Sequence, residues 1–408
     1  MKCRHCNNKL EHVFLDLGFA PPSNAYLTIE ELSQPESYFP LKLYVCEECW
    51  LVQTEDYARA EELFSPDYAY FSSVSNSWLK HAKDYAIMIQ QRLNLGANSF
   101  VIEIASNDGY LLKNFVEAGI PCLGIEPTDS TANAAEKFGI PVIREFFGEN
   151  FADRLTYEGK QADLVIGNNV YAHVPDINDF TSGLKAVLKP GGTITLEFPH
   201  LLRLIDQNQF DTVYHEHFSY LTFTTVCSIF EQAGLRIFDV EEISTHGGSL
   251  RVYGSHVDDS RSVTPEVTEL IQTEINNGLH DIETYLTFQS CADRVKNDLL
   301  SFLIEQKRLG NTVVAYGAAA KGNTLFNYAG VKCDLLPAVF DAAPSKQGKF
   351  LPGSHIPIFS AEVMKQMKPD WVLILPWNIS DEVVAQHGYL ESWGGKFVVA
   401  VPEIRELV

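Results

Sequence analysis

From residue 103 the chain reads Glu103-Ile104-Ala105-Ser106-Asn107-Asp108-Gly109, where an apolar run at 100–104 meets a helix expected at 109–118. Small side chains at a strand-to-helix turn let the backbone approach a ligand closely. The next apolar run, at 121–125, is followed by Glu126, whose carboxylate can accept both hydrogen bonds of a ribose diol. The stretch therefore predicts a nucleoside-binding turn at the edge of a parallel sheet.

Apolar runs and helical patterns alternate around this turn. Strands are expected at 100–104, 121–125, 164–166 and 193–198, and helices at 109–118, 130–138 and 177–188. Such alternation is typical of a doubly wound, mostly parallel sheet. A second alternation fills about 312–408, and further helical stretches are expected at 74–95 and 265–309. We therefore predict an α/β protein with a small N-terminal domain at 1–70, a central domain at 71–265 and a C-terminal domain at 266–408.

The charge balance is strongly acidic. The chain has 31 Lys and Arg residues against 53 Asp and Glu residues, which gives a net charge of −22. A field of this sign repels phosphate backbones, so we expect no nucleic-acid partner. No apolar run approaches the roughly 18–20 residues that span a bilayer, and no apolar signal core follows the first residues. We expect a cytoplasmic protein that does not bind membranes; the oligomeric state is left open, and a monomer is compatible with the sequence.

Two cysteine pairs at the N-terminus predict a metal site. They are Cys3 with Cys6 and Cys46 with Cys49, each pair separated by two residues. This spacing lets both thiolates of a pair face one ion, and four sulfur ligands suit tetrahedral zinc with no open position. The alternative is a pair of redox-active dithiols. We expect structural zinc that holds the N-terminal fold.

The densest group of titratable side chains is Asp211-Thr212-Val213-Tyr214-His215-Glu216-His217. It follows the strand expected at 193–198, past the carboxyl edge of the sheet, where α/β enzymes keep their sites. A histidine can act as a general base near neutral pH, and a tyrosine can donate a hydrogen bond to a developing oxyanion. The alternatives are a surface pair of histidines or part of a metal site.

The turn at 103–109 resembles the cofactor-binding turn of class I methyltransferases, and Leu188-Lys189-Pro190-Gly191-Gly192 before the strand at 193–198 resembles a second motif of these enzymes. The resemblance implies a Rossmann-like central domain that binds S-adenosylmethionine. Members usually carry glycine at three alternate positions of the turn, and here Ala105 and Asn107 replace two of them. A ligand-free turn and a nicotinamide cofactor are the alternatives. The implied cofactor contacts are Glu103, Ala105, Ser106, Asn107, Asp108, Gly109, Glu126, Pro127, Asn168 and Asn169.

Nearly the whole chain resembles the C-methyltransferases that act on nucleotide-linked 4-keto-deoxysugars, a family that includes an enzyme of tetronitrose biosynthesis. The resemblance rests on the four cysteines, the turn at 103–109, Tyr-His-Glu-His at 214–217, His-Gly-Gly-Ser-Leu-Arg at 246–251 and Tyr-Gly-Ala-Ala-Ala-Lys-Gly-Asn at 316–323. It implies a Rossmann-like C-terminal domain that holds the nucleotide sugar.

The family resemblance also implies the residues of the reaction. His217 would be the general base and Tyr214 would assist at the sugar, with His173 and Glu216 as further catalytic residues. Small residues and a lysine at a helix start form a candidate diphosphate cradle at 317–323. The implied substrate contacts are Tyr68, Tyr70, His200, Lys321, Asn323 and Lys346. The alternatives are core packing for Tyr68, a role-free helix start for His173 and a solvated loop for Lys346.

The implied reaction is removal of a proton beside the ketone of a dTDP- or GDP-linked 4-keto-6-deoxysugar, at C3, followed by methyl transfer. Three rivals stay open: an O- or N-methyltransferase of the same fold, a nicotinamide-dependent nucleotide-sugar oxidoreductase, and a zinc-containing binding module without catalysis.

Overall fold

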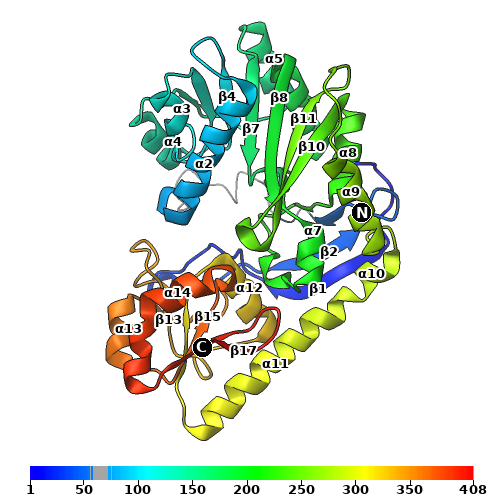
Figure 1. Cartoon of the computed structure of the whole chain (residues 1–408). Coiled ribbons are helices and arrows are strands. Elements are labelled where there is room, and N and C mark those ends of the chain that lie inside the picture. Colours follow the sequence, from blue (N-terminus) through cyan, green and yellow to red (C-terminus); the bar gives the residue numbers. More distant parts are fainter. Residues whose placement is uncertain (56, 58–71, 75, 408) are drawn as a thin grey trace. The chain divides into compact units, whose positions relative to one another are not determined.

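The computed structural model describes residues 1–407 except 56, 58–71 and 75 (Figure 1). The chain forms two compact units, and it passes from one to the other several times. The first unit contains Met1–Leu10, Cys46–His200 and Phe218–His280. The second contains Glu11–Val45, Leu201–His217 and Asp281–Val408. The division predicted at 1–70, 71–265 and 266–408 stays a prediction.

The first unit is built on a seven-stranded sheet among the described residues, in the order β10-β11-β8-β7-β4-β5-β6. Neighbouring strands from β6 to β8 are parallel, and β11 is antiparallel to both β8 and β10. This arrangement confirms the predicted doubly wound central domain. The strands are β4 (Val101–Ile104), β5 (Cys122–Ile125), β6 (Val142–Ile143), β7 (Ala162–Asn168), β8 (Leu188–Pro199), β10 (Leu235–Ile243) and β11 (Ser249–His256).

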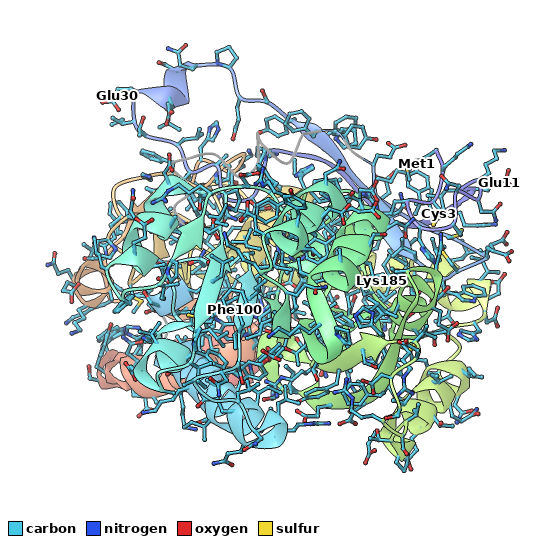
Figure 2. All side chains as sticks on the ribbon, turned by 90° about the horizontal axis from the view of Figure 1, so that it is seen from above. Met1, Cys3, Glu11, Glu30, Phe100 and Lys185 are labelled. Atoms are coloured by element: carbon cyan, nitrogen blue, oxygen red, sulfur yellow. The ribbon has the colours of Figure 1, made fainter. Side chains whose placement is uncertain are left out.

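Helices flank this sheet and supply much of its core. Tyr85 of α2, Phe115 of α3 and Tyr253 of β11 belong to one buried cluster with β4 and β7 residues. Figure 2 shows the side chains around the strands, with Phe100 labelled just before β4 and Lys185 in α6. The helices are α2 (Asn76–Leu93), α3 (Lys113–Glu117), α4 (Asp129–Glu136), α5 (Glu149–Tyr157), α6 (Ile177–Val187), α8 (Phe223–Gln232) and α9 (Pro265–Asn276).

Some elements of this unit were not predicted, among them α5, α8 and β10. The α8 sequence contains the β-branched residues Thr224, Thr225, Val226 and Ile229, which favour strands. The helix forms because Thr222 caps its start, accepting a hydrogen bond from the Thr225 N–H at 3.0 Å, and because its apolar face is buried. A further short pair, β3 (Val52–Thr54) and β9 (Ser219–Tyr220), is antiparallel.

The second unit contains a six-stranded sheet among the described residues, in the order β14-β13-β12-β15-β16-β17. Its pairs are parallel except for β16 with β17, which confirms the Rossmann-like C-terminal domain. The strands are β12 (Val313–Tyr316), β13 (Val339–Phe340), β14 (Ile358–Phe359), β15 (Trp371–Ile374), β16 (Lys396–Val399) and β17 (Arg405–Leu407).

The second unit also takes segments from the start and the middle of the chain. The antiparallel pair β1 (His12–Ala20) and β2 (Phe39–Val45) belongs to it, although both strands lie within the N-terminal domain predicted at 1–70. The helical stretch expected at 265–309 is three helices, α9 and then α10 (Ile282–Leu286) and α11 (Phe288–Leu309), of which only the last two lie in this unit. The other helices are α7 (Leu201–Asp206), α12 (Ala320–Ala329), α13 (Ala361–Met367) and α14 (Ser380–His387).

Within the described ranges, we find no helix with both the length and the apolar character to cross a bilayer. The cytoplasmic location stays a prediction.

A buried ion pair joins two neighbouring strands of the first unit. Arg251 of β11 lies directly opposite Glu197 of β8, and its Nε and Nη2 donate to Glu197 Oε1 at 2.8 and 2.5 Å. His81 Nε2 lies 2.9 Å from the other carboxylate oxygen, and the guanidinium stacks on the Tyr85 ring. Burial alone would raise the pKa of Glu197, but the His81 contact and the Arg251 charge lower it below its ordinary value. The carboxylate is therefore held in its charged form.

Replacing Arg251 by Met should destabilise the fold strongly, because it leaves the buried Glu197 carboxylate without its main counter-charge. We expect the free energy of unfolding to fall by about 3–5 kcal/mol in urea denaturation. The exposed pair of Lys160 and Glu158 provides the control, since Lys160→Met should change stability by less than about 1 kcal/mol. Equal effects of the two substitutions would show that the buried pair contributes no more to the free energy of unfolding than an exposed pair does.

Candidate functional site

The four N-terminal cysteines converge in the first unit. Their Sγ atoms all lie within 4.8 Å of one another, and Cys3–Cys49 and Cys6–Cys46 are 3.5 Å apart (Cys3 is labelled in Figure 2). A tetrahedron of Zn–S bonds of about 2.3 Å separates its sulfurs by about 3.8 Å. The cluster therefore fits zinc, and the four thiolates leave no open coordination position for chemistry.

The two cysteine pairs repeat one backbone turn. The Asn7 N–H donates to the Cys3 carbonyl at 3.0 Å, and the Trp50 N–H donates to the Cys46 carbonyl at 2.9 Å. Asn7 and Trp50 both have left-handed backbones, with φ of 61° and 60°. This is unusual for tryptophan, and its ring stacks on His280 at a centroid distance of 5.8 Å. We call these turns the first knuckle (residues 3–8) and the second knuckle (residues 46–51).

The turn after β4 keeps a left-handed backbone at three alternate positions. The φ angles are 56° at Ala105, 49° at Asn107 and 77° at Gly109. A left-handed residue other than glycine, asparagine or aspartate costs roughly 1–2 kcal/mol, so Ala105 is strained. A Cβ at Gly109 would lie 2.5 Å from Ile140 Cδ1 and 3.1 Å from Ala135 Cα. Glycine is thus required at position 109, because a side chain there would collide with α4 and with the residues that follow it.

Glu126, at the end of β5, ties this turn to the neighbouring strand. Its Oε2 accepts the Asn107 N–H at 2.9 Å, and its Oε1 accepts the Thr128 N–H at 3.0 Å and the Thr128 hydroxyl. Pro127 lies between, half-buried. The carboxylate is therefore fixed at the sheet edge, where a ribose was predicted.

Several buried polar atoms at the same edge have no hydrogen-bond partner among the described residues. They belong to Glu103, Ser106, Asp108 and Asn168. Burial raises the pKa of Glu103 well above its ordinary value, and the charges of Asp108 and Glu126 add to this. Buried polar groups without partners cost about 1–3 kcal/mol each, so this edge favours a polar ligand. Carboxylates and an amide fit the hydroxyl and amino groups of S-adenosylmethionine.

The loop after β7 carries two more predicted residues of the first unit. Asn169 has a left-handed backbone, with φ of 53°, and its N–H donates to the Glu197 carbonyl at 2.8 Å. His173 ends the 3-10 helix η3 (Tyr171–His173) and is half-buried. The loop then caps α6, because the Asp176 carboxylate accepts the N–H groups of Asn178 and Asp179.

The two histidines of Tyr-His-Glu-His have different surroundings in the second unit. The rings of Tyr214 and His217 are 4.1 Å apart between centroids, and the His217 N–H donates to the Tyr214 carbonyl at 3.0 Å. His215 instead lies near the Phe39 ring, with Nε2 3.4 Å from the Phe39 carbonyl. Glu216 accepts a hydrogen bond from Asn24 Nδ2 at 2.9 Å. The turn thus pairs the predicted base with the predicted donor and sets the other histidine apart.

Asp211 is a feature of this cluster to which the sequence assigned no role. It is buried in η4 (Phe210–Thr212), and its Oδ2 accepts the Trp377 Nε1–H at 2.8 Å. Lys321 Nζ lies 4.5 Å above the same indole and donates to Asn378 at 2.7 Å. Burial raises the pKa of Asp211 to about 6, although the Lys321 charge and the Trp377 bond oppose it. In the sequence, only the position of Asp211 shortly before Tyr-His-Glu-His could have indicated a role for this residue.

The remaining predicted substrate contacts are mostly engaged within the protein. His200 is 1% exposed, with Nε2 2.7 Å from Glu274 Oε1 in the first unit. In the second unit Asn323 donates to the Ser23 carbonyl at 2.6 Å, and Lys346 donates to the Ala318 carbonyl at 2.8 Å. Tyr68 and Tyr70 lie outside the described residues. All of these roles stay predictions.

The strand order, the left-handed turn and the buried acids at its edge define a class I methyltransferase that uses S-adenosylmethionine. The chain matches the family models described as "Methyltransferase domain" (residues 78–240), "C-methyltransferase C-terminal domain" (residues 244–402) and "Putative zinc binding domain" (residues 3–64). It is 33% identical to the C-methyltransferase NovU of Streptomyces niveus over 404 residues, 99% of this chain and 96% of that protein. The chain therefore belongs to this family of zinc-containing C-methyltransferases.

Two further proteins are similar to parts of this chain. An uncharacterized methyltransferase of Mycobacterium leprae is 26% identical over 98 residues, 24% of this chain and 36% of that protein. An S-adenosylmethionine-dependent methyltransferase of Clostridium acetobutylicum is similar in structure, with 12% identity and a TM-score of 0.35, over 44% of this chain and 92% of that chain.

Loss of one zinc ligand should release the metal and weaken the fold. We expect Cys46→Ser to lose bound zinc in elemental analysis and to lower Tm by at least about 5 °C, because a structural zinc site contributes folding free energy directly. Cys333→Ser is the control, since this exposed thiol lies outside the cluster and should change neither quantity. Unchanged zinc content in Cys46→Ser would rule out the four-sulfur site.

Replacing Asp211 by Asn should have a pH-dependent effect on stability. The folded-state pKa of about 6 lies above the unfolded value of about 3.9, so the charged carboxylate penalises the fold. The penalty is absent below about pH 4 and complete above about pH 6, where it reaches up to about 3 kcal/mol. The stability of Asp211→Asn relative to the parent should therefore rise between these pH values in urea denaturation. If the pKa of Asp211 is ordinary, the stability difference of Asp211→Asn should instead be flat over this pH range.

Proposed function

We propose that this C-methyltransferase methylates C3 of a nucleotide-linked 4-keto-6-deoxysugar, with His217 as the general base. The observation that carries the proposal is the pairing of Tyr214 and His217 in one turn, with ring centroids 4.1 Å apart. A base beside a hydroxyl donor is the combination that carbon methylation next to a ketone requires, because the proton must leave as charge develops on the carbonyl oxygen.

S-adenosylmethionine, when bound, supplies a methyl group on a positively charged sulfur. The residues of the chain prepare the carbon that accepts it. His217 removes the proton from C3, and the electron pair of that C–H bond moves to the C4 carbonyl oxygen as an enolate. The Tyr214 hydroxyl donates a hydrogen bond to this oxygen, and His173 keeps the catalytic role that the family resemblance implies. His217 then releases its proton to solvent.

Glu216 supports this arrangement through Asn24. The Asn24 amide donates to Glu216 Oε1 at 2.9 Å, and Thr324 Oγ1 donates to the Val213 carbonyl at 2.7 Å. These bonds fix both ends of the Tyr-His-Glu-His turn within the second unit. We infer that Glu216 orients a histidine of the site and does not itself remove the proton.

The nucleotide diphosphate is assigned to the second unit. Lys321 lies in the first turn of α12, and Lys346 Nζ donates to the Ala318 carbonyl in the turn between β12 and α12. A helix start favours an anion. We infer that these two cations hold the diphosphate of a dTDP- or GDP-linked sugar. Asn323 is 1% exposed and bonded to Ser23, so it supports the turn from inside. Tyr68, Tyr70 and His200 complete the proposed substrate set, and a monomer suffices for this assignment.

His217→Asn should abolish methyl transfer. We expect a fall in kcat of about 10²–10⁴-fold, the usual contribution of a general base, with the affinity for S-adenosylmethionine within about twofold of the parent. The assay uses labelled S-adenosylmethionine with dTDP- and GDP-linked 4-keto-6-deoxysugars, and NMR then locates the labelled carbon. The parent should also exchange the C3 proton with deuterated water, and His217→Asn should not.

His215→Asn is the matched control, because this histidine contacts Phe39 and does not pair with Tyr214. It should retain proton exchange and most of the turnover. Methyl transfer to oxygen or nitrogen, or full activity of His217→Asn, would disprove the proposed reaction.

A further inference from the structure

The two knuckles share a backbone turn but differ in the side chains between their cysteines. The second knuckle carries Glu47 and Glu48, which are both exposed. The first carries Arg4, half-buried, and His5, which is 2% exposed. Binding zinc requires only the cysteines. The burial of the first pair therefore serves something other than the metal.

The Arg4 guanidinium connects three segments of the first unit. Its Nη1 donates to the Pro175 carbonyl at 2.5 Å and its Nη2 donates to the Thr54 carbonyl at 3.0 Å. The guanidinium carbon lies 5.5 Å from the centre of the Phe218 ring. A planar guanidinium can make two directed hydrogen bonds and stack on an aromatic ring at once, which lysine cannot do.

His5 fixes the same region from the other side of the knuckle. Its Nδ1 lies 2.8 Å from Asn178 Oδ1 and its Nε2 lies 3.3 Å from Ser228 Oγ. The Asn178 amide returns a hydrogen bond to the His5 carbonyl at 2.8 Å. The first turn of α6 is thereby attached to the knuckle, immediately after the loop that contains His173.

The segments held by Arg4 are also bonded to each other. The Phe218 N–H donates to the Ala172 carbonyl at 2.8 Å, and the Thr54 N–H donates to the Phe218 carbonyl at 3.2 Å. Ala172 precedes His173, and Phe218 directly follows His217 in the sequence. The second knuckle leads into β3, whose partner β9 begins at Ser219. The first knuckle therefore contacts both segments that carry the proposed catalytic histidines. The second knuckle leads through β3 to the segment that follows His217.

We propose that the zinc module is a clamp, in which Arg4 is a positioning residue that fixes residues 172–175 and Phe218 and so couples zinc binding to the two histidine-bearing segments. The proposal rests on the proposed function only for the catalytic consequence. The contacts that make up the clamp lie in the first unit and are tested separately, by amide hydrogen exchange.

The test compares Arg4→Ala with Glu48→Ala in the full-length, zinc-loaded protein. In Arg4→Ala, amide hydrogen exchange should accelerate about tenfold in the peptides covering 169–178 and 214–221, while β4 and β5 stay protected and the zinc content is unchanged. Glu48→Ala should exchange like the parent. Removing zinc from the parent with a chelator should expose the same two peptides.

The catalytic consequence is measured with the sugar that the parent methylates. Arg4→Ala should lower kcat about tenfold with the KM for S-adenosylmethionine nearly unchanged, because a small displacement of reacting groups reduces turnover without removing a ligand contact. Arg4→Lys keeps the charge and one hydrogen bond, so it should recover part of both the protection and the kcat.

Three outcomes would overturn the clamp. They are unchanged exchange in both peptides of Arg4→Ala and Arg4→Lys, uniform acceleration across the whole first unit, and loss of zinc from Arg4→Ala. If the parent methylates no keto-sugar, the proposed function fails, and the exchange measurements still decide the clamp. If His217→Asn is inactive but Arg4→Ala keeps full kcat and protection, the proposed function holds and the clamp fails.

Discussion

The bonding of four thiolates to one zinc ion is the constraint on which much of the first unit depends. Cys6 and Cys46 lie on either side of the segment 11–45, which belongs to the second unit. The metal therefore fixes both ends of this excursion at one point. From that point the first knuckle contacts the loop before α6, and the second continues into β3. A small metal site thus sets the positions of segments that are far apart in the sequence.

The turn at residues 105–109 combines a strained backbone with buried polar groups that a ligand can satisfy. Ala105 and Asn107 adopt a backbone that glycine would adopt freely, and buried carboxylates crowd the same turn. Neither feature favours the folded chain by itself. Both are understandable at a site that must present acceptors to a ligand with several donor groups. Glu126 limits the cost, because its carboxylate accepts backbone N–H groups from Asn107 and Thr128.

The central fold could be predicted from the sequence because its strands are short apolar runs separated by helical patterns. The zinc cluster could also be predicted, because the two-residue spacing within each cysteine pair lets both thiolates face one ion. The α8 helix was missed because burial overrides the strand preference of its β-branched residues. The placement of 11–45 with the second unit depends on contacts between distant segments, which no local pattern encodes. Likewise, the sequence cannot show that His215 contacts Phe39 or that Asp211 is buried beside Trp377.

The interleaved order of the segments has a consequence for how the polypeptide matures. The β1–β2 hairpin leaves the ribosome before most of the first unit, yet the sheet of its own unit is encoded after residue 312. The two parts of the second unit are therefore synthesised far apart in time. No single cut separates the two units, because a fragment ending at residue 280 would still carry two orphaned pieces of its neighbour. Truncated versions of this enzyme are therefore poor starting points for isolating the first unit, because its three segments would have to be joined by new linkers.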